Sequence, residues 1–148
     1  MDIKLPVSFF LLLPIFLYFN PHEDILPERQ WSQYRGYNSN GVLDNAELPE
    51  NWDLDNNENI KWRIEIPGLG LSSPIIWGDK LFITTAISER DSKGLKTGIY
   101  GDIGSVNDDS EHEWKVICIN KQNGKVIWER TSCTGIPEQK RHPKSSHA

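Results

Sequence analysis

The feature that most constrains the fold is a β-hairpin predicted over residues 117–130, with the sequence ICINKQNGKVIWER. Two runs rich in β-branched residues flank a polar turn that closes on Asn123-Gly124. Asn-Gly is a strong hairpin signal because Gly, and Asn nearly as well, tolerates the positive φ of a tight turn. Apolar residues alternate on both sides of each run, so both faces of the hairpin are largely apolar. Strands of this kind need cover on both faces.

The hairpin resembles the blade motif of pyrroloquinoline-quinone-like (PQQ-like) β-propeller repeat proteins. The resemblance lies in a Cys-Ile-Asn run, a polar turn, Asn-Gly-Lys, two aliphatic residues and Trp128. In that family the motif forms the last two strands of a four-stranded blade, and its Trp docks between neighbouring blades. The resemblance implies this docking role for Trp128, although a hairpin of a β-sandwich can also carry Asn-Gly and a buried Trp.

A second copy of part of the motif supports the comparison. Ile60-Lys61-Trp62, followed by Ser72-Ser73, recurs as Ile127-Trp128, followed by Ser145-Ser146, and Trp62 and Trp128 lie 66 residues apart. Blade repeats span about 40 to 50 residues, so we expect an insertion, and residues 88–113 supply it. We assign a structural blade motif to Trp62, Asn123, Gly124 and Trp128.

The rest of the chain reads as strands, turns and one long loop. Residues 31–36 (WSQYRG) are similar to the first segment of exported propellers and predict a short strand and a turn. Residues 60–66 alternate and predict a strand with Ile60, Trp62, Ile64 and Ile66 on one face. Residues 75–77 and 81–83 predict a second hairpin around Gly78-Asp79. Residues 88–113 are rich in Gly and charge, and a loop of this length is either functional or disordered.

These elements predict an all-β fold, a β-propeller of four-stranded antiparallel blades. Closed propellers contain about 4 to 8 blades, whereas residues 31–148 supply only the first one to two. We therefore interpret the sequence as the incomplete, N-terminal part of a longer propeller protein.

The N-terminus predicts export. Residues 1–19 contain Lys4 and then an uncharged apolar run of fifteen residues, 5–19. This run is shorter than the roughly 20 residues of a membrane-spanning helix, which favours a signal peptide. No small-x-small cleavage site precedes Asn20, so an N-terminal anchor remains the alternative. We expect a linker over residues 20–30 and a periplasmic or extracellular location, with membrane contact only through an uncleaved residue 1–19 segment.

Composition restricts the partners. The chain of 148 residues has a formal net charge of −5 and no basic stripe, which argues against nucleic acid. Its 37% hydrophobic and 25% charged residues are typical of a soluble globular protein. The partner class stays open between a protein and a small-molecule ligand.

No catalytic or metal-binding constellation is evident in the sequence. The four His lack metal-ligand spacing, and we expect His142 and His147 to face solvent, with a substrate contact as the alternative. Arg35 is interpreted as a structural partner. The Asp53 to Asn57 stretch lacks the Gly and Glu of a calcium-binding hand, which leaves a solvated loop.

The two cysteines are expected to stay unpaired. The predicted register places Cys118 opposite Ile127 and the loop residue Cys133 opposite His112. Six strand residues at about 3.3 Å each then separate the thiols by about 20 Å, far beyond disulfide reach.

The resemblance leaves two function classes open. We favour a non-catalytic binding or assembly scaffold, which needs no cofactor in this fragment. The alternative is a quinone-dependent oxidoreductase, whose PQQ, calcium ligands and catalytic Asp would belong to later blades.

Overall fold

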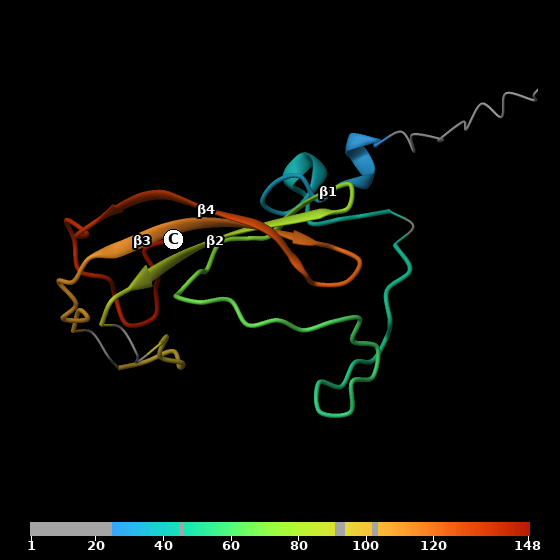
Figure 1. Cartoon of the computed structure of the whole chain (residues 1–148). Coiled ribbons are helices and arrows are strands. Elements are labelled where there is room, and N and C mark those ends of the chain that lie inside the picture. The colour runs from blue at the N-terminus through green and yellow to red at the C-terminus, as the bar shows by residue number, and fades with distance from the viewer. Residues whose placement is uncertain (1–24, 45, 91–93, 102–103) are drawn as a thin grey trace, which may run out of the picture.

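The computed structural model describes residues 25–44, 46–90, 94–101 and 104–148. The strands of these residues form one antiparallel sheet, which does not close on itself (Figure 1). Its strands, in the spatial order β1-β2-β3-β4, are β1 (Ile75–Trp77), β2 (Lys80–Ser88), β3 (His112–Asn120) and β4 (Val126–Gly135). Two 3-10 helices, η1 (Pro27–Arg29) and η2 (Tyr37–Ser39), precede the sheet. The all-β class is therefore confirmed.

The predicted hairpin of residues 117–130 is the β3–β4 pair. Asn120 organises its turn, because its Oδ1 accepts hydrogen bonds from the backbone N–H groups of Gln122 at 2.8 Å and Asn123 at 3.2 Å. Gly124 alone uses the left-handed backbone, with φ +71°. Asn123 instead uses its side chain, which accepts from the Lys125 N–H at 3.0 Å. The turn is thus a side-chain-capped loop in which Gly124 supplies the positive φ.

The second predicted hairpin is β1–β2, and β2 is longer than expected. Ile75 pairs with Phe82 and Trp77 with Lys80. Before β1, a side-chain contact takes the place of backbone hydrogen bonds to β2. The Ser72 hydroxyl lies 2.8 Å from Thr84 Oγ1. Leu69 then exchanges two backbone hydrogen bonds with Ala86, at 2.9 and 3.0 Å. Residues 69–77 therefore follow the edge of β2, and Pro74, which has no N–H to donate, lies where the pairing is interrupted.

Residues 60–66 do not form the predicted strand. Ile60, Trp62, Ile64 and Ile66 are partly buried and the residues between them are exposed, so the predicted facing is confirmed. No strand of the described chain pairs with them, and Figure 1 shows an extended segment without an arrow. Alternation specifies which side chains face inward, but a strand also needs a neighbouring backbone to bond.

The first folded segment lies against the free edge of β1. The Trp31 carbonyl accepts a hydrogen bond from the Ile76 N–H at 2.7 Å, and Gly36 packs against the Trp31 ring. Instead of the predicted short strand, Trp31 forms a single bridge followed by a turn. Gln30, in the predicted linker, is also ordered, since its Oε1 accepts from the Gly78 N–H at 2.8 Å.

Two register shifts correct the predicted cysteine positions. Cys118 pairs with Trp128 and Cys133 with Trp114, because β4 carries an extra residue at each of two irregularities. Cys133 therefore lies in β4 rather than in a loop. Both thiols are free, Cys118 buried and Cys133 exposed. Four residues along β3 separate the two pairs, about 13 Å at 3.3 Å per residue, so the cysteines stay too far apart for a disulfide.

The buried apolar core is small. In the described residues it consists of Ala86, Ile117, Cys118 and Ile119. Large apolar side chains remain exposed on the sheet, including Trp77 at 42%, Val126 at 50% and Ile127 at 48%. The cover that these strands need is therefore only partly supplied by the described chain.

The segment predicted to direct export, residues 1–19, lies outside the described residues. In the part of the chain that is described, no helix has the length and apolar character needed to cross a membrane.

Candidate functional site

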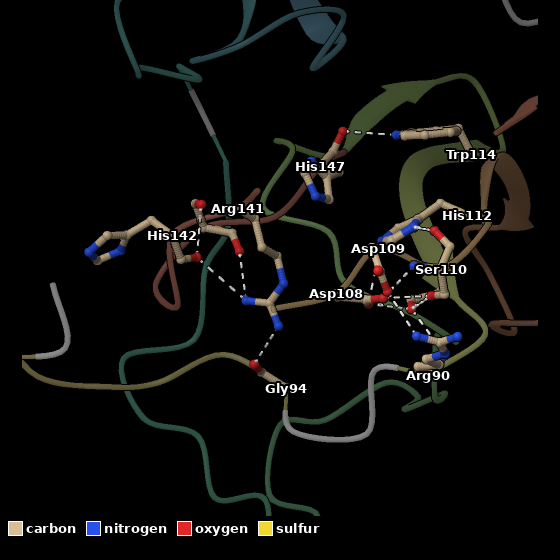
Figure 2. A network of polar contacts seen from close by, with 12 residues as sticks. Arg90, Gly94, Asp108, Asp109, Ser110, His112, Trp114, Arg141, His142 and His147 are labelled. Carbon is tan, nitrogen blue, oxygen red and sulfur yellow. Dashed lines mark hydrogen bonds and ion pairs between the residues drawn. The ribbon is translucent and has the colours of Figure 1, made fainter. Parts of the chain in front are cut away.

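A polar cluster forms where β2 ends and β3 begins. The antiparallel register places Ser88, the last residue of β2, opposite His112, the first residue of β3. The long loop and the C-terminal segment fold back to this point, as Figure 2 shows. The cluster, here called the β2–β3 cluster, consists of Ser88, Asp108, Ser110, His112, Arg141 and His147.

Asp108 is the anionic centre of the cluster. Its Oδ1 accepts hydrogen bonds from Ser110 Oγ at 2.6 Å and from the Ser110 N–H at 3.1 Å. Ser88 Oγ donates to Oδ2. Burial opposes ionisation, but the bonds from Ser110 and Ser88 and the nearby His112 lower the pKa of Asp108 from 3.8 to about 2. Asp108 is therefore a carboxylate at neutral pH.

His112 lies between oxygen acceptors. Only 3% of it is exposed, and its Nδ1 is 3.0 Å from the Ser110 carbonyl, an acceptor to which it must donate. Its Nε2 is 3.8 Å from Asp108 Oδ2. The ring stacks on Trp114 at 5.7 Å and meets the edge of the His147 ring at 5.1 Å. The imidazolium form would donate from both nitrogens.

Arg141 ties the C-terminal segment to the long loop. It is 6% exposed, and its guanidinium donates to the carbonyls of Gly94 at 3.2 Å and Ser145 at 3.4 Å (Figure 2). Backbone bonds reinforce the contact, because the Val106 N–H donates to the Arg141 carbonyl and the Lys96 N–H to that of Pro143, each at 2.9 Å. The described residues between β2 and β3 (89–90, 94–101 and 104–111) form no helix or strand, as predicted for this loop, and Gly94, Lys96 and Val106 tie it to the C-terminal segment.

His147 does not face solvent, which corrects the prediction for this residue. It is partly buried beside His112, and its carbonyl accepts from Trp114 Nε1 at 3.0 Å. Burial lowers the pKa of His147, and the charges of His112 and Arg141 lower it further, while Asp108 opposes them. His142, in contrast, is exposed as predicted.

The cluster encloses a cavity of about 220 Å³. Its polar wall is formed by Ser88, His112, Arg141 and His147, and the rest is lined by Gly68, Leu69, Ala86, Ile87 and Gly94. Ser88 and Ser110 both donate to the Asp108 carboxylate, so neither hydroxyl is aligned on His112 as a nucleophile would be. No group of three His, Cys, Asp or Glu side chains among the described residues is arranged to hold a metal. The arrangement suits binding through fixed donors.

The residues assigned to the blade motif fall into two places. Trp62 lies on the β3–β4 turn, where its Nε1 donates to the Lys121 carbonyl at 2.8 Å. A Cβ on Gly124 would come within 2.8 Å of the Trp62 ring. Asn123 belongs to the same turn. Trp128 lies apart from them on the sheet, half-buried, with its ring 6.0 Å from that of Phe82.

The remaining candidates stay at the surface. Arg35 is exposed in a turn, at φ 61°. Asp53 accepts from the backbone of Asp55 at 2.8 Å and from Asn56 Nδ2 at 2.7 Å. The carboxylate of Asp53 thus stabilises its own loop, in agreement with the predicted solvated loop.

Sequence reasoning did not identify Ser88, Asp108 or Ser110. One local signal was available, because Asp108, Ser110 and His112 occur at alternate positions directly before an apolar strand. Alternate residues of an extended chain share a side, which predicts that the three side chains meet.

No known protein family, curated protein or solved structure matches this chain.

Proposed function

We propose that this chain is the first blade of a PQQ-like β-propeller, completed by later blades, and that the assembled protein is a non-catalytic binding or assembly scaffold. The observation that carries the proposal is the sheet itself. Four antiparallel strands follow one another in chain order, β1-β2-β3-β4, which is the arrangement expected of a propeller blade.

The position of Trp62 supports docking between repeats. Trp62 belongs to the first copy of the repeated motif, Ile60-Lys61-Trp62, and the second copy is Ile127-Trp128 in the β3–β4 hairpin. The Trp62 ring covers Gly124 in the turn of that hairpin. Trp128 occupies the corresponding place in the second copy and is only half-buried. In the proposed propeller, Trp128 covers the turn of the next blade in the same way.

The exposed apolar surface supports further blades. Trp77, Val126 and Ile127 are 42%, 50% and 48% exposed, and β4 has an unpaired outer edge in the described chain. Adjacent repeats bury such faces in repeat architectures. We place the assembled protein in the periplasm or outside the cell, exported by residues 1–19.

The scaffold role is proposed over the oxidoreductase because the β2–β3 cluster offers binding groups and no aligned nucleophile. Its cavity measures about 220 Å³, and adjoining hollows of about 420 and 470 Å³ share Arg141 with it. Groups that hold PQQ and calcium would have to come from later blades.

Two measurements test the proposal. Sedimentation velocity of residues 20–148 should show concentration-dependent association, whereas a protein extended by the following coding sequence should be monomeric with one cooperative unfolding transition. A sharp transition of a monomeric 20–148 chain would refute the blade assignment. Incubating the extended protein with PQQ and calcium and following dye reduction with alcohols or sugars separates the two function classes, since a scaffold leaves the dye unreduced.

A further inference from the structure

We infer that the cavity of the β2–β3 cluster is a binding site for a small oxyanion, a short carboxylate or a phosphate. The polar side chains on its wall are Ser88, the guanidinium of Arg141 and the imidazoles of His112 and His147. Of the described residues that line the cavity, none carries a carboxylate. Arginine is permanently charged and matches planar or tetrahedral oxyanions with its fork of N–H donors.

The charge of the cluster favours an anion in the cavity. Asp108 lies behind His112, 3.8 Å from its Nε2, rather than on the cavity wall. Arg141 places a permanent positive charge on the wall itself. The lowered pKa of His147 reports the resulting field, since after burial the charges of His112 and Arg141 are its largest causes. A bound anion would offset this repulsion.

The site is also preorganised. Arg141 is held by the carbonyls of Gly94, Ser145 and His142 at 3.2 to 3.5 Å. His112 is fixed by Ser110 at 3.0 Å and by stacking on Trp114. Donors that are already ordered lose little conformational freedom when a ligand binds.

The volume limits the size of the ligand. Liquid water occupies about 30 Å³ per molecule, so a cavity of about 220 Å³ corresponds to roughly seven water molecules. Acetate or inorganic phosphate fits this space. The inference concerns residues of this sheet and its loops, so it holds whether or not further blades follow.

Histidine NMR of the 148-residue chain tests the inference directly. Sodium acetate and sodium phosphate are titrated at constant ionic strength against sodium chloride, with acetamide as the neutral match for acetate. We expect a saturable shift of the His147 and His112 signals with at least one oxyanion, and a rise in the pKa of His147 because the anion stabilises its imidazolium. Saturation by only one of them identifies the carboxylate or the phosphate class.

The inference is overturned if neither oxyanion gives a saturable shift, or if acetamide or chloride gives the same shift. This measurement uses the unaltered chain and does not depend on any variant. A failed titration leaves the blade proposal untouched, and the association experiment of that proposal does not affect the titration.

Two matched variants locate the site. Arg141→Gln removes the charge and should weaken oxyanion binding about tenfold or more, the usual size of a lost charged hydrogen bond. Arg90→Gln is the control, because Arg90 is an exposed partner of Asp109 at 2.8 Å and does not line the cavity; its affinity should stay within about twofold. Equal losses in both variants would show non-specific charge attraction. If Arg141→Gln does not fold, Arg141→Lys replaces it and should show an intermediate affinity.

Discussion

Substituting Gly124 by Ala tests the contact between the Trp62 segment and the β3–β4 turn. Gly124 has φ +71°, and a Cβ at this position would lie 2.8 Å from Cδ2 and Cε3 of Trp62. Two costs therefore add. The left-handed backbone costs a non-glycine residue about 1–2 kcal/mol, and forcing a methyl group into a filled contact costs about 1–3 kcal/mol.

The chain offers a matched control for the backbone cost. Gly101 has φ +80°, similar to Gly124, and no described residue lies within 4 Å of an added Cβ. Gly101→Ala should therefore lower the free energy of unfolding by no more than about 1–2 kcal/mol, and Gly124→Ala by roughly 2–5 kcal/mol, the sum of both costs. Urea unfolding followed by tryptophan fluorescence measures both values.

A double-mutant cycle isolates the steric part. In a Trp62→Ala background the ring is gone, so Gly124→Ala should cost only the backbone part of about 1–2 kcal/mol. The coupling between the two positions should thus be about 1–3 kcal/mol. Equal costs of Gly124→Ala in the two backgrounds would show that Trp62 does not lie on this turn, and the proposed docking between repeats would lose its support.

Three further predictions concern the loop, the carboxylate and the thiols. Because the folded pKa of Asp108 is about 2 and its ordinary value is 3.8, its contribution to stability is present above about pH 4 and is lost as the pH falls towards 2. Asp108→Asn should flatten the acid limb of the stability–pH curve, and an unchanged limb would contradict the assigned hydrogen bonds. Limited chymotrypsin digestion should cut first within residues 88–113, after Tyr100, which is 90% exposed; a first cut in β4 instead would show the sheet to be wrong. Thiol titration should find one reactive group in the native chain, the exposed Cys133, and two after denaturation, because Cys118 is buried and burial raises the pKa of its thiol; two fast thiols in the native state would contradict the burial of Cys118.

The sequence predicted those parts of the fold that depend on local patterns. Asn123-Gly124 between two apolar runs predicted the β3–β4 hairpin, and Gly78-Asp79 predicted β1–β2. Both signals act over a few residues, where turn chemistry limits the choices. The register was missed by one or two positions, because each irregularity in β4 inserts a residue that alternation alone does not reveal.

The candidate site was largely beyond prediction because it depends on contacts distant in sequence. Gly94 and Arg141 are 47 residues apart, and Trp114 and His147 are 33 apart. His142 and His147 look alike in the sequence, next to polar residues near the end of the chain. Their environments differ because the segment turns after Pro143 and brings only His147 against His112.

Residues 60–66 show how one pattern supports two different structures. Alternating Ile and Trp residues satisfy a strand that has a bonded neighbour, and they equally satisfy an extended segment that lays one face on a finished sheet. No strand of the described chain pairs with residues 60–66, and the free edge of β2 is taken by residues 69–77. Trp62 then finds its hydrogen-bond partner on the β3–β4 turn instead of on a ladder. Trp128 differs from Trp62 in its backbone, because Trp128 belongs to strand β4 and pairs with Cys118 of β3. Its ring alone remains available for a neighbouring blade, which is why the proposed docking at Trp128 requires side-chain contact and no additional strand.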